Sequence, residues 1–241
     1  MDDVTVDLAS DSLYAEKDSA AYRFKRRLTY RTVLFAIKRA AGDRRKFSLL
    51  EIGTGSGYLA CFVEQEHPEA IVTGVEYDPR LVALTQSKVS RATIQQGNAE
   101  QLGLDGQQFD VIVSLQVIEH LYHPEKMLEG VRRLLAPGGR FILTTPNLGC
   151  LSARVMKDKW HGYRPDHVAL KDRDDWVAFA ERHGFRTVYS GSTFFSGIPW
   201  LNRLPMGVVN WALLYFIGVA PWNQGESFFG VFERSTREPQ S

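Results

Sequence analysis

Residues 49–58 read Leu-Leu-Glu-Ile-Gly-Thr-Gly-Ser-Gly-Tyr, and this stretch decides the expected fold. The apolar residues around Glu51 predict a buried strand. Gly53, Gly55 and Gly57 follow it at alternate positions. Glycine tolerates positive φ and lets a ligand approach the main chain closely. The stretch therefore predicts a buried strand that runs directly into a ligand-binding turn.

The acid before the turn indicates which kind of ligand would bind. The dinucleotide fingerprint G-x-G-x-x-G needs a small third residue at the position that Tyr58 occupies. A carboxylate at Glu51 would repel a pyrophosphate, whereas it suits a ligand with positive charge. S-adenosylmethionine is such a ligand, because it carries a sulfonium and an ammonium and no phosphate. The turn therefore favours S-adenosylmethionine over a nicotinamide dinucleotide.

At these residues the chain resembles the class I S-adenosylmethionine-dependent methyltransferases (type 11/23-like), whose first motif is an acid followed by G-x-G-x-G. The resemblance covers residues 47–147 well and the C-terminal third only loosely, and the chain is similar to quinone-biosynthesis O-methyltransferases. It implies S-adenosylmethionine as the cofactor. It also implies that the methionine part and the adenosine are bordered by Glu51, Gly53, Gly55 and Gly57.

Two residues after the second predicted strand fit the ribose and the adenine. Glu76 follows Gly57 by 19 residues (76 − 57). This spacing suits the acid that accepts hydrogen bonds from ribose hydroxyls. The resemblance implies that role for Glu76 and places Tyr77 beside the adenine.

Two further segments complete the expected cofactor site. Residues 97–102 look like the family's G-D-A-E-x-L, with Asn98 where Asp is usual. The amide oxygen of Asn98 can still accept a hydrogen bond from the adenine amino group, at the cost of the charge. The resemblance thus implies adenine contacts for Asn98 and Ala99, and cofactor contacts for Leu115 and Gln116 after the fourth strand.

Candidate catalytic residues follow the fourth strand, where residues 117–121 resemble the family's V-x-E-H-L. Methyl transfer needs alignment and exclusion of water, and a base only if the acceptor must lose a proton. His120 is the best-placed base, because the adjacent Glu119 would orient its imidazole and raise its pKa. His167 is a further catalytic candidate. The alternative is that Glu119 and His120 merely hold the loop.

A metal site is a second possibility for the same residues. Some relatives, among them quinone and small-RNA O-methyltransferases, bind a divalent cation through Glu-x-x-Glu-His. Here Gln116 replaces the first Glu, which leaves Glu119, His120 and His167 as a small ligand set. Whether a metal binds stays open at this stage.

Alternating strand and helix patterns predict an α/β fold with a doubly wound, seven-stranded, mostly parallel sheet. The methyltransferase resemblance implies that its last strand inserts antiparallel. We expect one Rossmann-like domain over residues 1–241, with an N-terminal helical cap (14–41), a cofactor-binding core (47–147) and an apolar substrate-side insertion (192–226). The predicted strands are 47–52, 70–76, 93–96, 109–115, 140–145, 185–190 and 228–234, and the predicted core helices are 58–65, 79–89, 124–135 and 174–183.

Composition narrows the expected partners. The net charge of +1 over 241 residues gives no global attraction to nucleic acid. Residues 22–41 contain seven basic side chains and no acid, which fits either a solvated helix face or contact with RNA or an anionic membrane. The two cysteines match no metal spacing, and the N-terminus resembles no secretory signal, so we expect a cytoplasmic protein.

The apolar stretch 201–222 is interrupted by Pro205, Asn210, Gly218 and Pro221, so it is too broken to span a bilayer. We interpret it as helices over the substrate pocket, with peripheral contact to a membrane as the alternative.

The leading hypothesis is a methyltransferase that acts at oxygen on a small or lipid-like acceptor. The alternatives are an RNA 2′-O-methyltransferase and a non-catalytic partner-binding module on the same fold. No motif indicates the acceptor or the oligomeric state.

Overall fold

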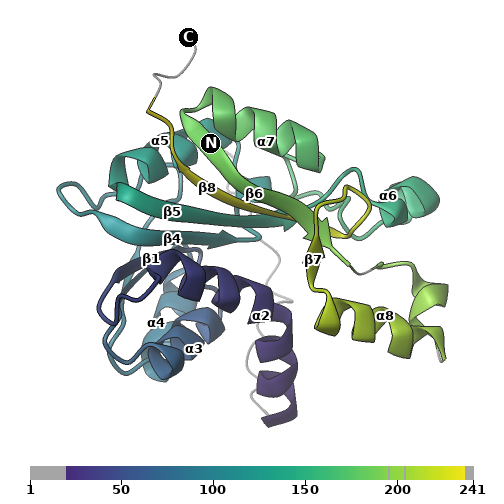
Figure 1. Cartoon of the computed structure of the whole chain (residues 1–241), viewed down its shortest axis with the longest axis horizontal. Coiled ribbons are helices and arrows are strands. Elements are labelled where there is room, and N and C mark those ends of the chain that lie inside the picture. Colours follow the sequence, from purple (N-terminus) through teal and green to yellow (C-terminus); the bar gives the residue numbers. More distant parts are fainter. Residues whose placement is uncertain (1–19, 195, 204, 237–241) are drawn as a thin grey trace.

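The computed structural model describes residues 20–194, 196–203 and 205–236, and its centre is one eight-stranded sheet (Figure 1). The strand order is β3-β2-β1-β4-β5-β8-β6-β7. The strands are β1 (Ser48–Ile52), β2 (Ile71–Glu76), β3 (Thr93–Gln96), β4 (Phe109–Leu115), β5 (Leu135–Pro146), β6 (Phe185–Thr193), β7 (Val219–Ala220) and β8 (Ser227–Arg234). Strands β1 to β5 pair in parallel, and β8 lies antiparallel between β5 and β6.

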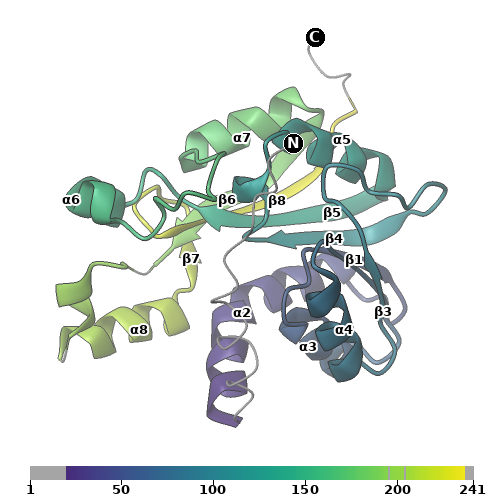
Figure 2. The same cartoon turned by 180° about the vertical axis from the view of Figure 1, so that it is seen from behind.

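Helices cover both faces of this sheet. Figures 1 and 2 show α2, α3 and α4 on one side and α5 and α7 on the other. The helices are α2 (Ala20–Ala41), α3 (Tyr58–Glu66), α4 (Pro79–Lys88), α5 (Pro124–Leu134), α6 (Leu151–Met156), α7 (Arg173–Arg182) and α8 (Met206–Phe216). The described residues also form short 3₁₀ helices, namely η2 (Ile118–His120), η3 (Lys157–Lys159) and η4 (Pro199–Asn202).

Two hydrophobic clusters follow from the alternation of side chains along the strands. Leu50 and Ile112 point into the cluster formed with α5 and α7. Their neighbours Leu49, Val111 and Val113 point into the cluster formed with α2 and α3. The central strands are therefore buried on both faces, which explains why they read as nearly continuous apolar runs in the sequence.

Local signals fix where the helices begin and end. Asp78 accepts a hydrogen bond from the Arg80 amide at the start of α4, and Pro79 occupies the first helical turn. Asp172 caps α7 in the same way by accepting from the Asp175 amide. Gly184 follows α7 with φ of +84°, the left-handed conformation that commonly ends a helix.

The predicted fold class is confirmed, but the sheet has eight strands instead of seven. The extra strand, β7, has only two residues and pairs antiparallel with β6, so its period-2 pattern is too short to detect in the sequence. Strand β5 is also longer than the predicted 140–145, because it begins at Leu135, which was predicted as the last residue of a helix, and it has a register shift opposite β4.

The N-terminal cap and the apolar insertion both contain helices. Helix α2 begins at Ala20, and residues 14–19 of the predicted cap lie outside the described residues. The apolar stretch 201–222 contains the end of η4, then α8 and β7. Helix α6 was not predicted from the sequence. Within the described ranges, every helix is too short or too polar to cross a bilayer.

Candidate functional site

The residues expected at the cofactor lie at one edge of the sheet, where the parallel strands end. Ile52 of β1 pairs with Val75 of β2 and with Ser114 of β4, so these three strands finish at the same level. The glycine turn, Glu76 and Leu115 come directly after these pairs. Ligands of open α/β sheets bind outside this edge.

The glycine turn is tightly packed at both ends and open in the middle. Gly53 and Gly57 have φ of +76° and +77°. A Cβ on Gly53 would collide with Val117, and one on Gly57 would lie 2.7 Å from Thr85 Cγ2. A Cβ on Gly55 would meet no atom within 4 Å. The main chain at Gly55 is therefore the part of the turn that a ligand can approach.

Helix α4 holds the turn in place through a residue that the sequence did not point to. The Thr85 hydroxyl is fully buried and donates a hydrogen bond of 2.9 Å to the Gly55 carbonyl. From the same helix, the Lys88 ammonium donates to the Ser56 carbonyl at 3.1 Å. No motif marks Thr85, because its role depends only on where α4 crosses the turn.

Two buried acids border this turn. Glu51 is 3% exposed, and its Oε2 atom has no hydrogen-bond partner among the described residues. Burial, followed by the negative charge of Glu76, raises the pKa of Glu51 well above its usual range. A buried carboxyl oxygen without a partner is costly. A ligand that brings positive charge or a donor to this point would supply what Glu51 lacks.

The second acid, Glu76, is fixed by the main chain. Its Oε2 accepts from the Gly55 amide at 2.8 Å, and its Oε1 accepts from the amides of Tyr77 and Asp78 at 2.8 and 3.1 Å. The carboxylate is thus held at the end of β2, beside the turn. Tyr77 is 73% exposed, so its ring is available to a ligand.

The remaining predicted cofactor residues lie at the ends of β3 and β4. The side-chain oxygen of Asn98 accepts a hydrogen bond from the Glu100 amide, and Ala99 packs partly against the core. Leu115 is half-buried and Gln116 is exposed. Gln116 has φ of +56°, which is rare for a residue with a side chain and is typical of functional sites. The Asn98 oxygen keeps one lone pair for a further donor.

The three predicted catalytic residues come together. Ligand atoms of Glu119, His120 and His167 all lie within 4.8 Å of one another. Glu119 is fully buried; its Oε2 accepts from the Thr145 hydroxyl at 2.9 Å, whereas its Oε1 has no partner among the described residues. Burial, with a smaller contribution from the charge of Asp166, raises the pKa of Glu119 to about 7.

Hydrogen bonds to carbonyl groups fix the tautomers of both histidines. His120 Nδ1 lies 3.0 Å from the Asp166 carbonyl oxygen and 3.3 Å from its carboxylate. His167 Nδ1 lies 2.8 Å from the Gly162 carbonyl oxygen. Because a carbonyl can only accept, each Nδ1 carries the hydrogen, and each neutral imidazole presents Nε2 as an acceptor.

These contacts refine the expected arrangement. His120 is oriented by a hydrogen bond to Asp166 and not, as expected, by the neighbouring Glu119, whose carboxyl accepts a hydrogen bond from Thr145. The imidazole rings of His120 and His167 meet edge to face with centroids 4.8 Å apart. Partial burial lowers the pKa of His167; the hydrogen bond to Gly162 opposes this effect, and a proton on His120 would add to it. His167 is therefore neutral at pH 7.

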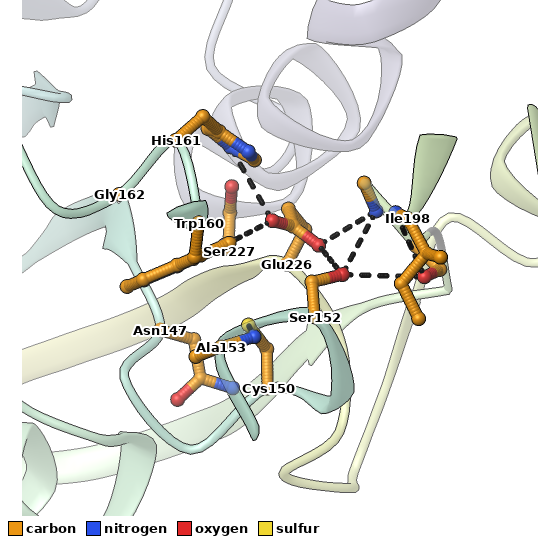
Figure 3. Close-up of polar contacts among 12 residues, drawn as sticks. Asn147, Cys150, Ser152, Ala153, Trp160, His161, Gly162, Ile198, Glu226 and Ser227 are labelled. Carbon is orange, nitrogen blue, oxygen red and sulfur yellow. Dashed lines mark hydrogen bonds and ion pairs between the residues drawn. The ribbon is translucent and has the colours of Figure 1, made fainter. Parts of the chain in front are cut away.

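Another buried acid, Glu226, joins segments that are far apart in the sequence (Figure 3). Its Oε2 accepts from the Ser152 hydroxyl at 2.6 Å and from the Gly197 amide at 2.8 Å. Its Oε1 accepts from the Trp160 indole and lies 3.3 Å from His161 Nε2. Every side of this carboxylate is satisfied. It therefore fastens α6, the turn at residues 160–162 and the loop before η4 to the start of β8.

Glu226 also explains how His167 is placed. The turn that Glu226 holds ends at Gly162, whose carbonyl receives the His167 hydrogen bond. The sequence offered one signal for Glu226, because it is the lone charged residue between Arg203 and Glu233. An acid isolated in an apolar stretch is expected to be buried and bonded.

Replacing Glu119 by Gln tests its unusual environment. Because the folded-state pKa is raised, the native protein holds this proton more tightly than the unfolded chain, and stability falls as pH rises from about 4.5 to about 7. Glu119→Gln cannot ionise and avoids this loss. Its free energy of unfolding relative to the natural protein should be higher at pH 8 than at pH 5 by about 3 kcal/mol.

Urea denaturation at both pH values measures this difference, with Glu129→Gln on the exposed side of α5 as the matched control. A pH-independent effect of Glu119→Gln would show that the carboxyl titrates normally.

The Glu226 cluster gives a graded prediction. Glu226→Gln places an amide N–H₂ among donors and should lower the free energy of unfolding by about 2–4 kcal/mol, the range for a broken, buried, charge-assisted network. Ser152→Ala removes one of the bonds and should cost about 1 kcal/mol. Both values come from denaturation midpoints. Equal stability of the two variants would contradict the central role of the Glu226 carboxylate.

Comparison with known proteins agrees with this geometry. The family model of a methyltransferase domain matches residues 21–190. A Mycolicibacterium smegmatis protein named a probable S-adenosylmethionine-dependent methyltransferase is 37% identical over 99 residues, which are 41% of this chain and 38% of that protein. The ubiquinone biosynthesis O-methyltransferase of Coxiella burnetii is 29% identical over 103 residues, 41% of this chain and 43% of that enzyme.

These curated relatives are therefore matched over less than half of their length. Among solved structures, a chain in the complex of the Haloferax volcanii Trm112 methyltransferase activator with a protein assigned as a methyltransferase superposes with a TM-score of 0.68. It is 15% identical and covers 95% of this chain and 97% of its own, so it supports the fold alone. With the family model matched over most of its length, this chain belongs to the S-adenosylmethionine-dependent methyltransferases.

Proposed function

We propose that this protein methylates a hydroxyl oxygen of a small or lipid-like acceptor. The observation that carries the proposal is the cluster of Glu119, His120 and His167 at the end of β4, in which two imidazoles present Nε2 as a proton acceptor. A hydroxyl must lose its proton during methylation, whereas an amine with a free lone pair does not need a base. A site that holds such acceptors therefore favours oxygen chemistry.

The residues around the glycine turn fit S-adenosylmethionine. Glu51 offers a buried carboxyl oxygen without a partner, which suits a cationic ligand. Gly55 leaves open space at the main chain, and Glu76 is fixed beside it for the ribose hydroxyls. When bound, the cofactor supplies an electrophilic methyl group. We assign its binding to Glu51, Gly53, Gly55, Gly57 and Glu76, with further contacts from Tyr77, Asn98, Ala99, Leu115 and Gln116.

The chain's own residues would then position the acceptor and remove its proton. The acceptor oxygen gains the methyl group, and its hydrogen passes to Nε2 of the His120–His167 pair. Because burial lowers the pKa of His167, this imidazole is neutral at pH 7 and ready to accept. Asp166 and Gly162 keep the Nδ1 hydrogens in place, so Nε2 of each ring is left as the proton acceptor.

Glu119 lies close to both histidines. With a pKa of about 7, its carboxyl is close to half ionised at neutral pH, so a positive charge arriving on the histidine pair would stabilise its ionised form. The same three side chains are also a small ligand set for a divalent cation. A comparison of activity before and after chelation would distinguish proton transfer by these residues from metal binding.

The relatives and the insertion support the class of acceptor. The Coxiella relative is named for O-methylation in ubiquinone biosynthesis, which favours an oxygen acceptor for the matched region here. The described part of the 192–226 insertion is rich in exposed apolar side chains, including Trp200 and Phe216. These features favour a lipid-like acceptor with a hydroxyl group over a strongly charged one.

The glycine turn gives a paired prediction for the cofactor. Gly55→Ala adds a methyl group in the open space and should weaken binding of S-adenosylhomocysteine at least tenfold, with a stability loss of only about 1 kcal/mol from the positive φ. Gly57→Ala collides with Thr85 and should destabilise the fold more. Calorimetric titration and denaturation check both variants. Unchanged binding by Gly55→Ala would place the cofactor elsewhere.

The histidine pair gives the prediction for catalysis. His120→Ala and His167→Ala should each lower kcat by about 10²–10⁴-fold, the usual range for a general base, while S-adenosylhomocysteine affinity stays the same. The double variant should lose little more than either single one if the two act as a unit.

Transfer of labelled methyl groups to a panel of small catechols and prenylated phenols measures this effect, with the exposed His123→Ala as the control. Full activity of both variants would contradict proton transfer, and equal losses of kcat and cofactor affinity would indicate a structural role.

A further inference from the structure

Helix α8 has its polar and apolar sides reversed relative to an ordinary surface helix. Its eleven residues carry no charge, and only Gly207 and Asn210 are buried. The exposed side chains are large and apolar: Met206, Val208, Val209, Trp211, Tyr215 and Phe216, followed by Ile217. A continuous exposed patch of this kind usually marks a binding surface.

The reversal is built into the structure and does not come from loose packing. The buried amide of Asn210 accepts from the Ser196 amide at 3.0 Å and donates to the Ser196 carbonyl and the Asn202 side chain, both at 2.8 Å. A Cβ on Gly207 would lie 2.5 Å from the Asn202 carbonyl oxygen. The side of α8 that carries Asn210 and Gly207 is therefore packed against the protein, and the apolar side faces the solvent.

A basic helix lies beside this patch. Arg31, Phe35 and Arg39 recur every four residues of α2, so they share one face. The Arg31 guanidinium donates to the Tyr215 carbonyl and lies 5.0 Å from the centre of the Tyr215 ring. Figures 1 and 2 show α2 and α8 on the same side of the sheet. The two helices thus form one surface, which we call the α2–α8 face.

Between the two helices, the α2–α8 face contains a groove of about 720 Å³ against β6 and β8. Its floor and walls are apolar, and its charged lining residues within the described ranges are Arg31, Arg39 and Arg140. The sequence has no acid from residue 22 to residue 41. Aromatic and aliphatic side chains next to arginines, without acids, complement the interface of an anionic bilayer.

We propose that the α2–α8 face docks on an anionic lipid bilayer. Helix α8 spans only about 16 Å at 1.5 Å per residue, so it lies in the plane of the interface and does not cross the membrane. Its apolar side chains enter the acyl boundary, and the α2 cations contact lipid phosphates. This inference goes beyond methyl transfer and does not rest on it, because docking needs neither the cofactor nor the histidines.

Charge complementarity favours a bilayer over a protein partner. A protein surface that matched this face would need acids aligned with Arg31 and Arg39 and a hydrophobic pocket for each side chain of α8. A bilayer provides diffuse negative charge and a continuous apolar layer, which suits flexible arginines and a row of exposed Val, Trp and Phe side chains.

Co-sedimentation with vesicles tests the proposal in the absence of cofactor. The full chain should bind vesicles of equal parts phosphatidylcholine and phosphatidylglycerol at least tenfold more tightly than vesicles of phosphatidylcholine alone, and added salt should weaken this binding. Tryptophan fluorescence should shift to shorter wavelength, because Trp211 of α8 is 40% exposed and would enter the bilayer interface. Equal affinity for both vesicles, or none for either, would overturn the proposal.

Matched variants locate the surface. Val208→Asp and Phe216→Asp change side chains that are 60% and 76% exposed, so the fold should tolerate them, and each should weaken vesicle binding at least tenfold. Arg39→Glu should weaken binding to the anionic vesicles only. The controls are Ile71→Asp, at a side chain 53% exposed, and Lys126→Glu on α5. Circular dichroism confirms folding. Equal losses in the controls, or a protein complex formed in place of vesicle binding, would overturn the assignment of this face.

Discussion

The packing of the glycine turn after β1 is the constraint on which the proposed cofactor site and the histidine cluster both depend. Gly53 fits against Val117, and Gly57 fits against Thr85, so the turn is clamped between the segment after β4 and helix α4. Val117 is only two residues before Glu119. A shift of the turn would therefore move the cofactor side and the histidine cluster together, which gives the glycines a role in alignment as well as in ligand access.

Three buried acids illustrate how hydrogen-bond satisfaction separates structure from function. Glu226 has donors on both oxygens, and it holds segments together. Glu51 and Glu119 each leave one buried oxygen without a described partner, and burial raises the pKa of both. Buried polar groups are normally satisfied, so the exceptions point to ligands or protons that come and go. Helix α8 is a comparable exception at the surface, because its large apolar side chains are exposed and this also indicates a binding partner.

Much of the fold could be predicted because its signals are local. Strands β3 and β4 were predicted at their observed bounds, since short apolar runs between turn residues define them. Strand β7 was missed because two residues carry no periodicity, and α6 because its six residues hold no clear apolar stripe. At the site, Glu76 was predictable from its spacing to the glycines, whereas Thr85 was not, because only the crossing of α4 over the turn gives it a partner.

The sequence by itself determined the family, the succession of core strands along the chain and the residues that gather at their carboxyl ends, because parallel strands bring short motifs to one edge. Only the tertiary structure decided which groups those residues touch. It paired His120 with Asp166, fixed the His167 tautomer through Gly162 and joined α2 to α8 in one face. Each of these contacts links residues through the folded backbone, and a hydrogen bond depends on the distance and angle that the fold imposes, which residue order does not record.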